Sequence, residues 1–265
     1  MTYLQDAAMS ADRTRALIAE IIATSLLVGI GLGSVHVAVA TGALSLPAIA
    51  ACWGGAVVLL ILVCAPASGA HANPAVTIAL ACLGRFPWHR VTPYIIAQVL
   101  GALAAAALLH LLFADVHTHQ AIVTGRPLTD LIAAANTEHY PHPGLLAGID
   151  LPWWKAALAE AGGTGLILAA IVASTRPGVP SLAVPPAVGL SVALAIAIFA
   201  PVSQAGFNPA RDLAPRLVAW SVGAVPAFSC CWFAVYVVAP VVGAIASGFL
   251  VTYLTPKAEV PAPVG

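Results

Sequence analysis

The sequence repeats one short polar motif, Asn-Pro-Ala, at two places far apart in the chain. The two copies are Asn73-Pro74-Ala75 and Asn208-Pro209-Ala210. Asn is a good helix N-cap and Pro suits the first helical position, so each copy predicts the start of a helix. A helix start carries unpaired N–H groups and the positive end of the helix dipole. Two such starts with their side-chain amides predict a site that binds water or hydroxyl oxygens and opposes cations and protons.

The composition indicates where these helix starts lie. The chain is 61% hydrophobic and only 8% charged, whereas a soluble domain carries about 25% charged residues, so it is predicted to be an integral membrane protein. With ten basic and ten acidic residues it has no basic excess that would attract nucleic acid, and we expect no such partner. A helix that starts at membrane depth must be buried in protein or line a watery cavity.

The lengths of the apolar segments predict an all-α membrane protein with six transmembrane helices and two re-entrant half helices. The half helices are the runs from Asn73 to Cys82 and from Asn208 to about Trp220, which are too short to cross a ~30 Å hydrocarbon core. The six full spans are expected at about residues 14–40, 46–67, 91–113, 153–174, 183–200 and 227–254.

The two halves of the chain repeat three markers in the same order. Besides Asn-Pro-Ala, the pattern Ala-Glu-x-x-x-Thr begins at Ala19 and again at Ala159, and Ala-x-Val-x-Gly-Ala begins at Ala97 and again at Ala239. Three spans per half is an odd number, so the second half must enter the membrane from the opposite side. The expectation is an inverted repeat in one transmembrane domain, residues 1–265, with its site near the midplane. The first repeat is placed at about 13–113, a linking loop at 114–150 and the second repeat at about 151–254.

The distribution of basic residues predicts the orientation. Cytoplasmic loops are enriched in Lys and Arg, and a model with both termini in the cytoplasm leaves only Arg126 and Lys155 in the outer loops. The alanine-rich chain with short tails indicates a bacterial cytoplasmic (inner) membrane. The basic residues expected on the cytoplasmic side are Arg13, Arg15, Arg85, Arg90, Arg176 and Lys257.

The paired motifs, the two Ala-Glu-x-x-x-Thr patterns and the segment Ser68-Gly69-Ala70-His71 resemble the aquaporin, or major intrinsic protein, family. The resemblance covers about Ala19 to Gly243. It implies a passive channel in the lipid bilayer with one pore per subunit, assembled as a homotetramer. It implies no enzymatic activity and no cofactor or metal.

The resemblance also implies a selectivity filter. Arg211, directly after the second motif, matches the family's filter arginine, and counting from the motifs gives Trp53, Ile196 and Ala205 as the other three positions. Two of these have ordinary alternatives, because Trp53 could anchor a helix at the outer interface and Ile196 could face lipid. Arg211 has its own alternative, an arginine that reaches from a helix end to the interface.

The filter residues bear on which solute passes. Water-selective family members resemble one another in having a histidine where this chain has Ile196. With Asp212 after the arginine and Pro201 before the second motif, this chain is more similar to the glycerol-conducting and nodulin-26-like branches. The expected solutes are glycerol-like polyols and water, with urea and neutral metalloid hydroxides as further candidates. The alternative within the family is a channel that conducts mainly water.

Three further residues have assigned roles. Glu20 and Glu160 occupy matching places in the repeat, and the resemblance implies that they hold backbone N–H groups of the re-entrant loops. The alternative is that they carry protons in a coupled secondary transporter. His71 is expected to line the inner vestibule. Two departures from the family pattern, Ala72 and Gln204, fall in the same loops.

Four histidines in the predicted linking loop have spacings that a metal site could use. They are His117, His119, His139 and His142. The spacing is loose, and we interpret the segment as a solvated loop without a metal. An intramembrane enzyme that uses the glutamates and histidines is the remaining alternative, although no nucleophile–base spacing occurs at span depth.

Overall fold

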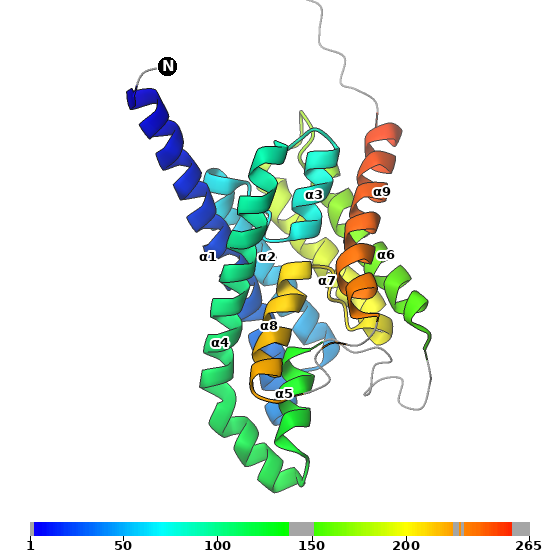
Figure 1. Cartoon of the computed structure of the whole chain (residues 1–265). Helices are drawn as coiled ribbons and strands as arrows, with labels where there is room; N and C mark the ends of the chain where they lie inside the picture. The colour runs from blue at the N-terminus through cyan, green and yellow to red at the C-terminus, as the bar shows by residue number, and fades with distance from the viewer. Residues whose placement is uncertain (1–2, 138–150, 225–227, 229–230, 256–265) are drawn as a thin grey trace, which may run out of the picture.

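Long apolar helices form the body of the molecule (Figure 1). The computed structural model describes residues 3–137, 151–224, 228 and 231–255, with the backbone alone for residues 3–11. Within these ranges six segments are long and apolar enough to cross a membrane, which confirms the predicted number of spans. They are Asp12–Thr41, Leu46–Ser68, Trp88–Thr124, Trp153–Ser174, Ser181–Ser203 and Ala234–Leu254.

The helices follow one another in the order that the repeat predicts. The first half holds α1 (Tyr3–Thr41), α2 (Leu46–Ser68), the half helix α3 (Pro74–Cys82), the short η1 (Trp88–Arg90) and α4 (Val91–Thr124). The second half holds α6 (Trp153–Ser174), η2 (Ser181–Ala183), α7 (Val184–Ser203), the half helix α8 (Pro209–Ser221), the π-helical turn η3 (Ala234–Val238) and α9 (Ala239–Leu254). Between the halves lies α5 (Leu128–Asn136).

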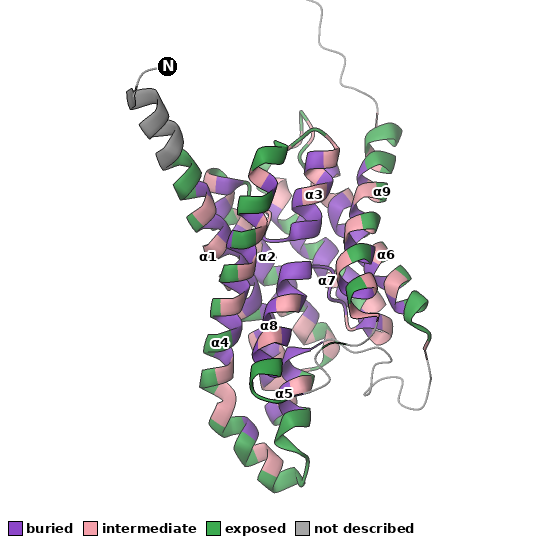
Figure 2. Cartoon of the chain, viewed as in Figure 1, coloured by how far each residue is buried: buried purple, intermediate pink, exposed green. Residues whose placement is uncertain are grey.

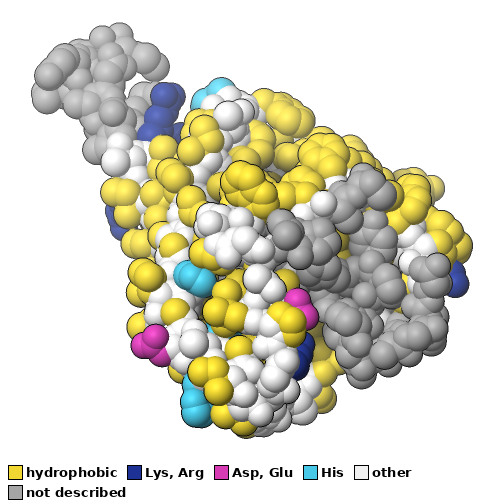
Figure 3. Space-filling model, turned by 60° about the horizontal axis from the view of Figure 1, so that its bottom comes forward, with side chains coloured by type: hydrophobic (Ala, Val, Ile, Leu, Met, Phe, Trp, Pro, Cys, Tyr) yellow, Lys and Arg dark blue, Asp and Glu magenta, His cyan; other side chains and the backbone are white. Residues whose placement is uncertain are grey.

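The half helices α3 and α8 occupy the interior of the bundle. They lie one beyond the other in Figure 1, and most of their residues are coloured as buried in Figure 2. With 9 and 13 residues they are about 14 and 20 Å long, too short to span the bilayer. The outer faces of the long helices, by contrast, expose large apolar side chains such as Leu62, Leu108 and Leu250, and few charged side chains appear among the hydrophobic ones in Figure 3. This surface suits lipid.

Two glycines allow the helices of each half to cross closely. A Cβ on Gly101 of α4 would collide with the carbonyl oxygen of Ile21 in α1, and a Cβ on Gly243 of α9 would collide with that of Ala161 in α6. Small residues let helix backbones approach in this way inside membranes. Ile21 and Ala161 each follow one of the repeated glutamates, so the two crossings are equivalent by the repeat.

The boundaries of the third span and of the link differ from the sequence prediction. Helix α4 continues to Thr124 instead of ending near residue 113, and α5 follows within the segment that was predicted to be a loop. Figure 1 shows that the end of α4 and α5 together form a projection from the bundle. The helix continues because the residues after Phe113 include good helix formers and no Pro or Gly before Gly125. The first helix likewise begins earlier than predicted, at Tyr3, and the last described helical segment begins later, at Ala234.

The interpretation of the link histidines as solvated is wrong for His117. Its side chain is 1% exposed, and its Nε2 atom lies 2.9 Å from Nδ1 of His36, which is fully buried in α1. This contact holds the last turns of α4 against α1. His119 is exposed, as expected, while His139 and His142 lie outside the described residues. No group of three or more potential metal-binding side chains of the His, Cys, Asp and Glu types is found within the described ranges.

Replacing one histidine of this pair should destabilise the protein. His117→Leu leaves Nδ1 of His36 buried without its partner, which costs about 1–3 kcal/mol. We expect a lower midpoint of thermal unfolding in detergent for His117→Leu. His119→Leu, two residues further along the same helix and exposed, is the matched control and should leave the midpoint unchanged. Equal midpoints for the two variants would show that the pair contributes nothing to stability.

Candidate functional site

The loop before the first half helix is held by one buried carboxylate. Glu20 of α1 is fully buried. Its Oε1 accepts hydrogen bonds from the backbone N–H of His71 at 2.9 Å and the hydroxyl of Ser68 at 2.7 Å. Its Oε2 accepts from the N–H of Ala72 at 2.9 Å and the side-chain amide of Gln98 at 2.7 Å. Four donors thus surround the carboxylate, as a buried charge requires.

The second half repeats this arrangement. Glu160 of α6 is also fully buried. Its Oε1 accepts from the N–H of Gly206 at 2.9 Å and the hydroxyl of Ser203 at 2.6 Å, and its Oε2 accepts from the N–H of Phe207 at 2.5 Å. Both glutamates therefore hold backbone N–H groups of the re-entrant loops, the contact that the family resemblance implies. Neither is among the residues that line the main cavity.

These bonds hold a backbone that would otherwise be unfavourable. Five non-glycine residues in the two loops have positive φ angles, a region that costs of order 1–3 kcal/mol for each such residue and persists only where surrounding contacts enforce it. They include both positions where the sequence departs from the family pattern. The five are Ala70 (φ 51°), Ala72 (φ 47°), Gln204 (φ 64°), Ala205 (φ 62°) and Phe207 (φ 54°).

A pair of tyrosines also supports the loops, and sequence reasoning missed both. The hydroxyl of Tyr94 donates to the carbonyl of Ser68 at 3.0 Å, and that of Tyr236 donates to the carbonyl of Ser203 at 2.9 Å. Each bond fixes the last residue of the helix that precedes a loop. A signal was present in the sequence, because each tyrosine stands three residues before a copy of the Ala-x-Val-x-Gly-Ala pattern.

The two asparagines of the repeated motif bond to each other's loops. The side-chain oxygen of Asn73 accepts from the N–H of Ala75 at 2.9 Å, and its amide donates to the carbonyl of Phe207 at 2.9 Å. The amide of Asn208 donates in turn to the carbonyl of Ala72 at 2.7 Å, while its oxygen caps α8. The two helix starts thus face each other across a reciprocal bond pair. Because an amide nitrogen carries two hydrogens, each asparagine keeps a second donor.

A cavity of about 420 Å³ passes these asparagines. Its wall includes Asn73 and Asn208 together with His71 on the side of the first loop. It also includes all four residues that were predicted to form a filter, namely Trp53, Ile196, Ala205 and Arg211. The structure therefore brings together polar residues from both halves of the chain. The prolines and alanines of the two motifs, Pro74, Ala75, Pro209 and Ala210, are buried but do not line the cavity.

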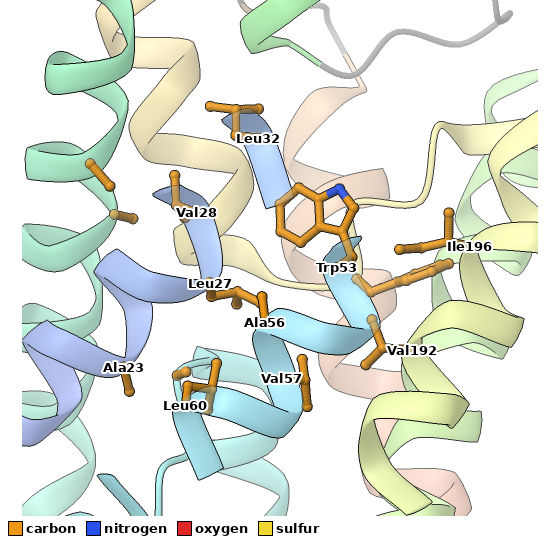
Figure 4. Packing of buried hydrophobic residues seen from close by; sticks show 14 of the residues in the cluster. Ala23, Leu27, Val28, Leu32, Trp53, Ala56, Val57, Leu60, Val192 and Ile196 are labelled. Atoms are coloured by element: carbon orange, nitrogen blue, oxygen red, sulfur yellow. The ribbon is translucent and has the colours of Figure 1, made fainter. Parts of the chain in front are cut away.

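One part of the cavity wall combines a guanidinium with apolar side chains. The guanidinium carbon of Arg211 lies 4.3 Å from the ring centroid of Trp53. Trp53 is 4% exposed and Ile196 is 6% exposed, so both side chains lie inside the bundle. Figure 4 shows these two side chains next to each other, projecting from α2 and α7. Gly31 of α1 makes room for the indole, because a Cβ there would collide with the Trp53 ring.

A buried ion pair within α8 supports the helix that carries Arg211. Its two residues do not line the cavity. Asp212 accepts from Nη2 of Arg216 at 2.6 Å, from Nε of the same residue at 3.1 Å, and from Nε1 of Trp232 at 2.6 Å. Asp212 and Arg216 are both 2% exposed. The carboxylate next to Arg211 is therefore engaged with Arg216 and Trp232. The sequence singled out Asp212 as a marker of one branch, but it did not predict this contact.

These features define a class of protein. Long apolar helices surround two short helices that start at the centre of the bundle, and a cavity runs past both starts with few polar groups in its wall. This is the architecture of a helical membrane channel built from an inverted repeat.

Comparison with known proteins identifies the family. The model of the major intrinsic protein family matches residues 7–251. Aquaporin NIP1-1 of Zea mays is 34% identical over 236 residues, which cover 88% of this chain and 72% of the maize protein. The glycerol uptake facilitator protein of Haemophilus influenzae is 37% identical over 251 residues, which cover 88% and 90%. The X-ray structure of the aquaglyceroporin from Plasmodium falciparum has a TM-score of 0.76 and 26% identity, covering 90% of this chain and 95% of that one. The chain belongs to the major intrinsic protein family.

The role of the glutamates can be tested by an isosteric substitution. Glu160→Gln replaces an acceptor oxygen by an amide nitrogen that faces N–H and O–H donors. Since a hydrogen bond to a charged group contributes about 1.5–3 kcal/mol, we expect a lower thermal midpoint together with reduced solute flux in vesicles. Asp115→Asn, an exposed carboxylate on α4, is the control and should resemble the original protein. A Glu160→Gln variant of undiminished stability that loses flux would instead favour proton-coupled transport.

Proposed function

We propose that this protein is a passive channel for small neutral solutes, chiefly glycerol-like polyols, and for water. The observation that carries the proposal is the arrangement around Arg211. The guanidinium of Arg211 packs against the ring of Trp53, and both side chains line the cavity together with Ile196 and the small Ala205. Urea and neutral metalloid hydroxides belong to the same proposed solute class, because they too present several hydrogen-bonding groups without a charge.

The selectivity filter that we propose consists of these four residues. A polyol has hydroxyls along one edge of its carbon chain and C–H groups along the other. Arg211 would donate hydrogen bonds to the hydroxyls, while Trp53 and Ile196 would contact the carbon atoms and replace the water lost from them. The guanidinium would also repel cations. Ala205 leaves space that a larger side chain would fill.

The pair of asparagines forms the second proposed point of contact. The second amide hydrogens of Asn73 and Asn208 would donate to one solute oxygen at a time as it passes. The positive ends of α3 and α8 point toward the same place, and this opposes the passage of cations and protons. Acceptors for the solute hydroxyls would come from backbone carbonyls of cavity-lining residues in the two loops, namely Gly69, Ala70, His71, Ala205 and Gly206.

The alternatives within and outside the family have less support. A channel mainly for water would gain from a donor at the position of Ile196, which has none. Proton-coupled transport would need Glu20 or Glu160 to exchange protons with the solute path, yet both are surrounded by donors behind the wall. An enzyme is disfavoured by membership of a family whose named relatives are an aquaporin and a glycerol uptake facilitator.

We also propose how the channel sits in the cell. The protein is a multi-pass protein of the cytoplasmic (inner) membrane with both termini in the cytoplasm. The start of α1 and the end of α9 at one end of the bundle (Figure 1) are consistent with this, as is the excess of basic residues near that end. A homotetramer with one pore per subunit remains the proposed assembly, and the chain acts as one channel domain made of two repeats.

Flux measurements in proteoliposomes test the proposed function. Vesicles that contain the protein should swell faster than empty vesicles in an inward glycerol gradient and in a water gradient, without any proton gradient. A solute panel that also includes urea, boric acid and arsenite would define the substrate range. Accumulation of glycerol against its gradient would refute a passive channel, and water flux without glycerol flux would establish the water-channel alternative.

A substitution in the proposed filter should shift selectivity toward water. Ile196→His adds a polar, bulkier group beside Trp53, which narrows the passage and removes an apolar contact for the polyol carbons. We expect the ratio of water to glycerol permeability to rise by roughly tenfold, the scale on which one apolar contact discriminates. Ile196→Leu preserves the apolar character and serves as the control. An unchanged ratio in Ile196→His would show that this side chain does not contact the solute.

A further inference from the structure

A second, smaller pocket lies at the side of the bundle, where α1 and η1 meet the start of α4. Its volume is about 110 Å³. It is lined by Arg13, Ala16 and Leu17 from α1, His89 and Arg90 from η1, and Pro93 and Tyr94 from α4. None of these residues lines the channel cavity, so the pocket is a separate site.

The charged residues that line the pocket are basic, and its two arginines are available to bind an anion. Two arginines and one histidine are among its seven lining residues and no acidic residue is, while most of the lining surface is apolar. Within the described part of the chain an ion pair joins Arg216 and Asp212, neither of which lines this pocket, and the buried Nε of Arg90 has no hydrogen-bond partner. The acidic residue nearest in the sequence is Asp12, which is exposed to solvent and lies close enough to Tyr94 to interact with it electrostatically. Two arginines around a small pocket favour a phosphate group, which a guanidinium can bind with two parallel hydrogen bonds.

The position of the pocket indicates the depth at which such a phosphate would lie. Two of the membrane-spanning segments begin beside it, at Asp12 and at Trp88. Trp88 is 59% exposed, as is typical of tryptophans at the level of lipid headgroups. From the pocket inward, both helices expose apolar side chains at helical spacing. These are Ile18 and Ile22 on α1 and Ile96 and Leu100 on α4.

We propose that this pocket binds the phosphate of an anionic phospholipid headgroup. Arg13 and Arg90 hold the phosphate, Ala16, Leu17 and Pro93 contact the glycerol region, and the acyl chains lie along the exposed apolar side chains of α1 and α4. The apolar continuation distinguishes a lipid from a free phosphate, which would gain nothing from it. Basic pockets between membrane helices on the cytoplasmic side suit anionic headgroups in general.

The lipid site adjoins a residue that supports the channel. Tyr94 lines the pocket, and its hydroxyl holds the carbonyl of Ser68 at the start of the first re-entrant loop. Its ring lies 5.3 Å from that of His71, which lines the channel cavity, and 4.7 Å from that of Phe86. A bound headgroup therefore packs against the side chain that fixes the inner loop. The lipid stabilises the protein through this contact.

The experiment compares lipid binding by the full-length protein and three variants. Native mass spectrometry and thermal unfolding would be recorded in phosphatidylcholine alone, with added phosphatidylglycerol, and with inorganic phosphate. The double variant Arg13→Gln/Arg90→Gln removes both proposed ligands, and Arg90→Lys keeps the charge but loses the planar fork. Arg15→Gln is the matched control, because Arg15 is exposed on the same turn of α1 and does not line the pocket.

We expect the original protein and Arg15→Gln to retain phosphatidylglycerol and to unfold at a higher temperature when it is present. The double variant should bind it roughly thirtyfold more weakly, since two basic residues at an anionic surface are lost, and Arg90→Lys should be intermediate. All variants should unfold at the same temperature in phosphatidylcholine alone, which controls for misfolding. Equal retention by the double variant and Arg15→Gln would overturn the site. Stabilisation by inorganic phosphate as large as that by phosphatidylglycerol would overturn the assignment to a lipid.

Discussion

Two helices that begin in the interior of a membrane protein impose the constraint on which the rest of this structure depends. Their first N–H groups, and those of the loops that lead to them, cannot be satisfied by lipid. The chain satisfies them with two buried carboxylates and two capping asparagines. Because the two carboxylates hold the loops from outside the cavity, the cavity wall keeps only a few polar groups, among them the amides of the two asparagines. The solute path is thus a consequence of the protein groups that bind the N–H groups of the two helix starts in place of water.

The inverted repeat explains the symmetric support, and its departures from symmetry account for the position of the proposed filter. The glutamates, the tyrosines and the glycine crossings recur in both halves. Three residues after each motif asparagine, however, the first half has Val76 and the second has Arg211, and both side chains line the cavity. Gln98, which contacts Glu20, has Pro240 as its counterpart in the second half. Under the proposed function, a solute would be selected beside Arg211, which only the second half supplies, and would also pass the two asparagines.

Much of this arrangement could be predicted because its signals are local. Asn followed by Pro marks a helix start, and the length of an apolar run separates a full span from a half span, so both half helices and the six spans could be deduced from the sequence. The extension of α4 could not be predicted in this way. Residues 114–124 are more polar than the apolar run before them, so hydropathy no longer marks them as part of the helix. The bonds from Tyr94 and Tyr236 join residues 26 and 33 positions apart, and the Asp212–Trp232 contact depends on how the residues before η3 pack against α8. Contacts of that kind follow from tertiary structure, and the repeat offered the only hint of them.

An experimental density map of the protein in a lipid nanodisc with glycerol present would test the central claim most directly. The account predicts glycerol in the cavity, with hydroxyl oxygens about 3 Å from the guanidinium nitrogens of Arg211 and carbon atoms against Trp53. It also predicts that the amides of Asn73 and Asn208 border the same passage. A map in which protein density separates the two Asn-Pro-Ala segments, or in which glycerol binds away from Arg211, would contradict it.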